Sequence, residues 1–194
     1  MSSDTFDPAT HSYYRDGARI PGVTEVLREA GMLTDHSRTD PFYAERGTLV
    51  HEAIALDLRG ELDEESVDQE IRPYLESARM AYRQIDLTGG RYLVDWKSGA
   101  IEPGHRAQIA AYFYAVPALS PGRYYELQVY GDGYGGTVDM VEFGNITAAR
   151  PQPLLVSLAT NPPKLELVHN LRYHYDAFRG ALCVYNWKRR ERLA

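Results

Sequence analysis

The chain of 194 residues lacks the features of membrane and disulfide-bonded proteins. Its single cysteine, Cys183, excludes an internal disulfide and a four-cysteine iron–sulfur cluster. No run of about 18 apolar residues is present, so a transmembrane helix and a membrane partner are not expected. The first residues are polar and contain no apolar core of a secretory signal. These absences favour a cytoplasmic protein in a reducing compartment.

Positive charge is also scarce. The chain has 21 Lys and Arg against 27 Asp and Glu, a net charge of −6. This balance argues against a protein that binds nucleic acid by overall attraction. The charge is uneven, however, because acidic residues gather at 57–76 and basic residues prevail from Arg172 onward. The whole-chain value can therefore conceal a basic face.

The pattern of apolar residues changes along the chain from helix to strand. Its composition, 44% apolar and 25% charged, is that of one globular domain spanning residues 1–194. Helices are predicted at 24–30, 42–58, 107–116 and 176–192, and strands at 91–96, 124–130, 137–143 and 164–168. Residues 11–20 have the pattern of a hairpin. This order predicts an α/β (α+β) fold with a central mixed β-sheet flanked by helices, and a hairpin or loop insertion around 131–163.

The most informative segment is V-D-W-K-S-G at residues 94–99. On a strand, Asp95 and Lys97 project to the same side, while Trp96 points away. A carboxylate with an ammonium group beside it at a strand end suits metal-assisted hydrolysis, with Mg²⁺ or Mn²⁺ as the cation. The alternative is a structural ion pair.

Two helical segments carry further polar residues. The segment G-T-L-V-H-E-A at 47–53 places His51 on a helix, and Q-I-A-A-Y at 108–112 places Gln108 and Tyr112 one turn apart. His51 can equally be an ordinary core or surface histidine. Gln108 and Tyr112 can equally belong to a plain amphipathic helix.

Together, in this order, the three motifs resemble the RecB-type branch of the PD-(D/E)XK nucleases, especially its phage-borne exonuclease-like members. The opening residues, with His11, Tyr13 and P-G-V-T-E-V-L at 21–27, are similar to the first motif of that branch. Gly22 stands where the branch usually has serine. The resemblance implies a restriction-endonuclease-like core and a Mg²⁺- or Mn²⁺-dependent deoxyribonuclease, located in the host cytoplasm if a phage encodes it.

The resemblance also implies roles for individual residues. His51 would bind or support the metal, and Asp95 would bridge the metal and the attacking water. Lys97 would be the catalytic lysine, while Gln108 and Tyr112 would line the site and contact the DNA backbone. The implied partners are DNA and either further copies of the chain or a phage recombination protein.

The family pattern includes a second acid on a strand shortly before the D-x-K motif, and here two residues are candidates. If Gly89 and Gly90 form a two-residue hairpin loop, Asp86 lies on the same face of the sheet as Asp95, with the two Cα atoms roughly 7–8 Å apart. Asp139 ends a G-G-T-V-D phrase typical of the family, but it follows the D-x-K motif. Either could be a metal ligand. If neither is, the expectation becomes an inactive nuclease-fold module that binds DNA or protein.

Overall fold

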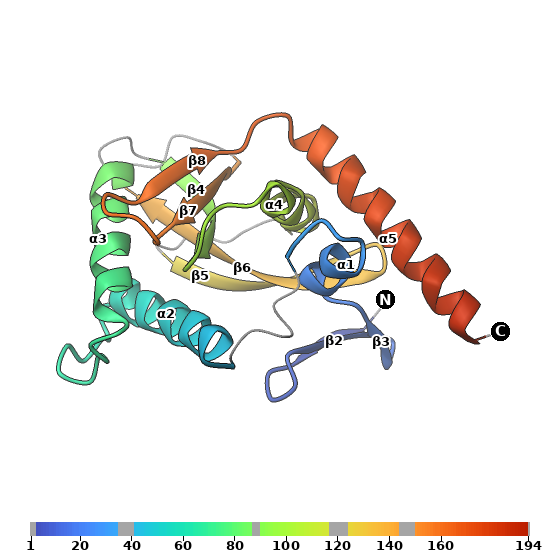
Figure 1. Ribbon diagram of the computed structural model, residues 1–194, viewed down its shortest axis with the longest axis horizontal. Coiled ribbons are helices and arrows are strands. Elements are labelled where there is room, and N and C mark those ends of the chain that lie inside the picture. Colours follow the sequence, from blue (N-terminus) through green and yellow to red (C-terminus); the bar gives the residue numbers. More distant parts are fainter. Residues whose placement is uncertain (1–2, 35–40, 87–89, 117–123, 144–149, 194) are drawn as a thin grey trace.

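The computed structural model describes residues 3–34, 41–86, 90–116, 124–143 and 150–193. Within these ranges the fold is a mixed α/β arrangement of two sheets and five helices (Figure 1). The small sheet is antiparallel, in the order β1 (Asp4–Asp7), β2 (Ser12–Arg15), β3 (Ala18–Ile20). The central sheet has the order β5 (Tyr124–Gly131), β6 (Tyr134–Phe143), β4 (Gly90–Lys97), β7 (Gln152–Ser157), β8 (Lys164–Leu167). The helices are α1 (Val23–Glu29), α2 (Pro41–Arg59), α3 (Arg72–Asp86), α4 (Pro103–Ala115) and α5 (Leu171–Leu193).

The predicted fold class is confirmed, because a mixed sheet lies between two groups of helices (Figure 1). Side chains alternate along β4, so Leu93 packs on the side of α1, α4 and α5 with Met140 and Leu155. Val94 and Trp96 face the other side, where α2 and α3 cover them. None of the helices in the described ranges is long and apolar enough to cross a membrane.

β4 is the central strand, with an antiparallel neighbour and a parallel one. β6 runs antiparallel to it and β7 parallel. Both neighbours come from the stretch 131–163, which thus contributes the strands on either side of β4. The connection from β4 to β7 contains α4, and this places α4 against the sheet beside the end of β4.

β4 and β6 separate at the point where the D-x-K motif begins. Their ladder runs from Gly90 opposite Phe143 to Val94 opposite Asp139 and ends there. Beyond it, β4 continues beside β7 only, and β6 continues beside β5. We call this separation the fork. The edge of β6 that β4 leaves is taken by the chain just before α1, where Gly135 N donates to Pro21 O at 3.0 Å.

The hairpin predicted around Gly89 and Gly90 is wrong. Asp86 is the last residue of α3, and its expected partner Leu93 lies opposite Met140 of β6. Buried Leu75, Ala78 and Ile85 continue the helical spacing to the end of α3. A helix outcompetes a strand here because these residues fill the core between α3 and the sheet. Residue 89 lies outside the described ranges.

Candidate active site

The two charged residues of the D-x-K motif lie together at the fork. Lys97 Nζ is 2.8 Å from Asp95 Oδ1, so the pair predicted from strand alternation is formed. Lys97 Nζ also donates to Gln108 Oε1 at 3.0 Å, which connects β4 to α4. The ammonium group is therefore held between a carboxylate and an amide oxygen.

Gln108 is itself fixed by two hydroxyl groups. Its Nε2 donates to Tyr112 Oη at 2.9 Å, one turn further along α4, and to Thr24 Oγ1 of α1 at 3.1 Å. Burial raises the pKa of Tyr112, so its hydroxyl group stays protonated. The orientation of Lys97 thus depends on three elements of the fold, β4, α4 and α1.

Asp95 has one oxygen engaged and one unengaged. The residue is 8% exposed, and its Oδ2 is buried with no hydrogen-bond partner among the described residues. A buried carboxylate oxygen without a partner costs free energy, and such atoms call for a specific explanation. Oxygen of this kind is the preferred ligand of Mg²⁺ and Mn²⁺.

Asp139 lies on the neighbouring strand at the same fork. It is opposite Val94, one position before Asp95, so its side chain leaves the sheet on the opposite face from Asp95. Tyr124 Oη donates to its Oδ1 at 3.0 Å. Burial raises the pKa of Asp139 to about 7, against the opposing effect of the Tyr124 hydrogen bond, and the charges of Glu126 and Asp95 raise it further. The two aspartates are thus electrostatically coupled.

His51, on α2, approaches the same strand end. Loss of hydration lowers its pKa, the charge of Asp95 opposes this shift, and Lys97 reinforces it. A backbone hydrogen bond with Trp96 places the imidazole beside β4. Part of His51 remains open to solvent. The fork therefore gathers the predicted residues His51, Asp95, Lys97, Gln108 and Tyr112, with Asp139 alongside, whereas Asp86 belongs to the end of α3.

Two residues near the site were not predicted from the sequence. His105, one turn before Gln108, accepts a hydrogen bond on Nδ1 from Glu102 N at 2.9 Å. Burial lowers its pKa to about 4, with a further contribution from Lys97. Glu126 lies opposite Asp139 on β5. The helical spacing of His105 and Gln108 indicates from the sequence that the two side chains lie on one side of α4. The position of Glu126 could be found only from the pairing of β5 with β6.

The glycines before Asp139 allow two tyrosines to approach the fork. A Cβ atom on Gly136 would lie 2.3 Å from Tyr112 Cε1, and one on Gly135 would lie 2.3 Å from Tyr13 Cγ. Tyr13 Oη in turn lies 2.8 Å from Thr137 Oγ1. Beside these rings is a cavity of about 340 Å³, whose lining includes Arg19, Thr24, Arg28 and Tyr112. The cavity therefore adjoins the residues that hold Lys97.

The donor set at the fork suits a hard divalent cation, although its side chains are not gathered around one point. Among the described residues, no three His, Cys, Asp or Glu side chains form a ready metal-binding group. The unpartnered Asp95 Oδ2 nevertheless fits a metal ligand, and Asp139 and His51 supply an oxygen and a nitrogen donor that interact electrostatically with Asp95. The carboxylate oxygens are the donors that Mg²⁺ and Mn²⁺ prefer, whereas imidazole is a better ligand for later transition metals.

Comparison with known proteins adds no further assignment at this point. No family model matches the chain, and neither a curated protein nor a solved structure matches it. The geometry of the fork is therefore the basis on which its chemistry is argued.

Proposed function

We propose that the chain is a Mg²⁺- or Mn²⁺-dependent deoxyribonuclease that hydrolyses phosphodiester bonds from a DNA end. The observation that carries this proposal is the Asp95–Lys97 pair, with Asp95 Oδ2 buried and unpartnered among the described residues. A purely structural ion pair has no need of a buried oxygen that receives no hydrogen bond. A metal-binding carboxylate needs such an oxygen.

The residues at the fork divide the chemistry between them. Asp95 and Asp139 would hold the cation, with His51 beside them as a further donor. A bound Mg²⁺ or Mn²⁺ lowers the pKa of water and stabilises negative charge on a phosphate. Lys97, oriented by Gln108, would place its ammonium group against the phosphate and the attacking water, where it offsets developing charge.

The environment of Asp139 supports a role that depends on the cation. With a pKa of about 7, this carboxyl group is partly protonated near neutral pH. A divalent cation held by Asp95 would offset the repulsion between the two carboxylates and would favour the ionised form of Asp139. Metal binding would therefore release a proton from Asp139.

A second candidate function is a nuclease fold without catalysis, which binds DNA or a protein. The observation in its favour is that the described residues contain no ready three-ligand metal group. Both candidates use the same fold, so only a direct assay of metal binding and cleavage separates them.

The test is Mn²⁺ titration by calorimetry with digestion of linear and covalently closed circular DNA. Wild-type protein is expected to bind Mn²⁺ and to degrade linear DNA only when the metal is present. Asp95→Ala should lose metal binding. Lys97→Ala should keep metal binding and lose digestion, because its ammonium group acts on the phosphate.

Three outcomes would count against the proposal. Wild-type protein that binds no divalent metal and leaves DNA intact would establish the inactive module instead. Digestion that Lys97→Ala leaves undiminished would remove the D-x-K motif from the reaction. Cleavage of closed circles at the rate of linear DNA would replace the exonuclease with an endonuclease.

A further inference from the structure

The acidic segment 57–76 and the basic helix α5 lie at opposite ends of the long axis of the molecule. The segment 57–76 lies where α2 ends and α3 begins, at the left in Figure 1, and α5 lies at the right. The helix α5 carries six Lys or Arg residues against two Asp or Glu, whereas the whole chain has a net charge of −6. A polyanion would therefore be repelled from one end of the molecule and attracted to the other.

Several cations of α5 have no carboxylate partner. Arg179 and Arg190 are exposed and form no ion pair among the described residues. Lys188 Nζ donates to the backbone oxygen of Glu29 at 2.8 Å, so its charge is not neutralised there. Arg189 binds the carboxylate of Glu25 at 3.1 Å. Lys188 and Arg189 are thus turned towards α1, so we call the outward pair Arg179 and Arg190 the α5 basic surface, which also has Glu191 at its edge.

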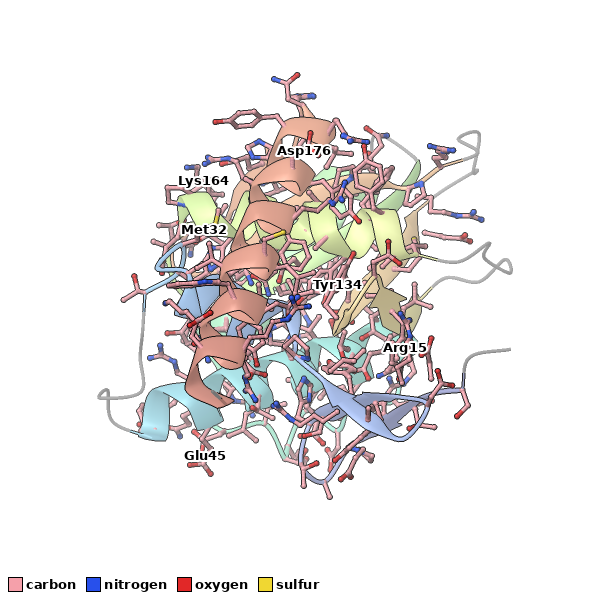
Figure 2. The ribbon with its side chains drawn as sticks, turned by 90° about the vertical axis from the view of Figure 1, so that its right-hand side faces the viewer. Arg15, Met32, Glu45, Tyr134, Lys164 and Asp176 are labelled. Carbon is pink, nitrogen blue, oxygen red and sulfur yellow. The ribbon has the colours of Figure 1, made fainter. Side chains whose placement is uncertain are left out.

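The geometry of α5 presents this surface outward. Figure 2 shows α5 in front of the rest of the molecule along its whole length, with Asp176 labelled near one end. Arg179 and Arg190 are eleven positions apart in the sequence, which is close to three helical turns. They therefore lie on one side of the helix, roughly 16 Å apart. Buried Phe178, Ala181 and Leu182 hold the opposite side of α5 against the core.

An exposed aromatic residue accompanies the arginines. Trp187 is 61% exposed, although it lies within a helix whose other side is well packed. Tyr173, nearer the start of α5, is 73% exposed. Large exposed aromatic side chains beside unpaired arginines can pack against the sugars of a nucleic-acid backbone.

The helix α1 connects α5 with the candidate active site. Tyr185 Oη donates to Glu25 of α1 at 2.6 Å, and Arg189 binds the same carboxylate. The same short helix supplies Thr24, which holds Gln108, and Arg28, which lines the cavity. The helix α1 therefore contacts both α5 and the residues that orient Lys97.

We propose that the α5 basic surface holds the sugar–phosphate backbone of duplex DNA whose end enters the fork. The identity of the ligand rests on the nuclease function proposed above. A duplex is favoured over a single strand because the arginines lie on a convex helix and contact phosphates there, whereas single strands are held in grooves. The binding is expected to be independent of base sequence.

The experiment measures binding of a fluorescein-labelled blunt duplex to the full chain by anisotropy, in EDTA to prevent cleavage. The variant Arg179→Glu/Arg190→Glu is compared with Arg83→Glu/Arg150→Glu. The control residues are also exposed and without an ion pair among the described residues, but they lie outside α5. The control makes the same change in net charge, so any difference between the variants is local.

The α5 variant is expected to lose roughly tenfold or more in affinity at low salt, and the slope of log affinity against log salt should fall by about two. The control should lose much less. Equal losses in the two variants, or wild-type protein that does not bind the duplex, would overturn the docking surface. A change of the α5 variant in sedimentation, with DNA affinity unaltered, would instead make α5 a contact between copies of the chain.

The docking surface and the nuclease function can fail separately. DNA binding that depends on α5, in a protein that never cleaves with Mn²⁺, would support the surface and overturn the nuclease. Cleavage by wild-type protein, with an α5 variant that binds as tightly as the control, would overturn the surface alone. Thermal unfolding of all variants verifies that each remains folded.

Discussion

Asp95 and Asp139 lie at the same fork but in different surroundings. Asp95 is paired with Lys97 and keeps one oxygen without a partner among the described residues. Asp139, on the other face of the sheet, accepts a hydrogen bond from the hydroxyl group of Tyr124, and burial raises its pKa to about 7. One carboxylate is thus compensated by a cation of the protein. The other is partly protonated near neutral pH.

The difference shows how the fold accommodates two buried acids at one fork. Two ionised carboxylates in a buried site repel each other strongly, and one of them commonly keeps its proton. Here the ammonium group of Lys97 lies 2.8 Å from Asp95, whereas burial and the charge of Asp95 raise the pKa of Asp139. The comparison can be tested by changing either acid, its pKa or the packing that holds the site.

The largest effect is expected from removing the acids themselves. Asp95→Asn and Asp139→Asn should each lower the rate of DNA cleavage by about 10²–10³-fold, because each would remove a charged metal ligand worth several kcal/mol. Asp86→Asn is the matched control, since Asp86 ends α3 away from the fork. The cleavage rates of the three variants, measured with a linear duplex and Mn²⁺, test this expectation. A loss with Asp86→Asn and none with Asp139→Asn would reverse the assignment of the second acid.

The second effect concerns stability and pH. The folded state keeps the Asp139 proton up to about pH 7, whereas the unfolded chain releases it near 3.8. Raising the pH between these values therefore destabilises the folded protein, by on the order of 4 kcal/mol in total, and above pH 7 the effect is constant. Urea unfolding of wild-type protein and Asp139→Asn should give free energies that diverge in favour of the variant between pH 4 and 7.

The same urea experiment contains its own check. Asparagine can still accept the hydrogen bond from Tyr124, so the variant differs chiefly in its charge. If the two stability curves run parallel across this pH range, Asp139 titrates as an ordinary carboxyl group and the comparison of the two acids fails. Added Mn²⁺ should stabilise wild-type protein more than the variant, since only the wild type retains both carboxylates.

Much of the fold could be predicted because its signals are local. The strand-forming residues at 91–96 after a glycine turn predicted β4, the helical spacing within 42–58 predicted α2, and the apolar run at 107–116 predicted α4. The hairpin at 11–20 was also predicted, and its turn residues Asp16 and Gly17 both have positive φ. In each case the residues that determine the structure are neighbours in the sequence.

What could not be predicted depends on contacts between distant segments. Pro151 and Pro153 argue against a strand in this segment, yet β7 is the parallel neighbour of β4. The pairing of β6 with β4, which brings Asp139 to the fork, joins residues more than forty positions apart. Thr24 reaches Gln108 only because the chain before α1 takes the edge of β6 that β4 leaves. The spacing of residues within the sequence does not indicate these pairings.

A smaller effect is expected from crowding the fork. Gly136→Ala would place a methyl group 2.3 Å from the buried ring of Tyr112, so the ring or β6 must move. The variant should lose about 1–3 kcal/mol of stability and part of its cleavage activity. Gly99→Ala is the control, because a Cβ atom there meets nothing within 4 Å. Equal stability of the two variants in urea would show that Tyr112 is not confined by β6.

The smallest effect is expected from weakening the hydrogen bonds that orient Lys97 through Gln108. Tyr112→Phe removes only the hydroxyl group that accepts a hydrogen bond from Gln108, while Thr24 continues to hold the amide. The loss of one such bond is worth about 1 kcal/mol, so kcat should fall about fivefold. KM for DNA should not change, because Tyr112 acts through Gln108 and Lys97. Tyr114→Phe, at an exposed position of the same helix, is the control. An unchanged kcat would mean that Thr24 alone is sufficient to orient Gln108.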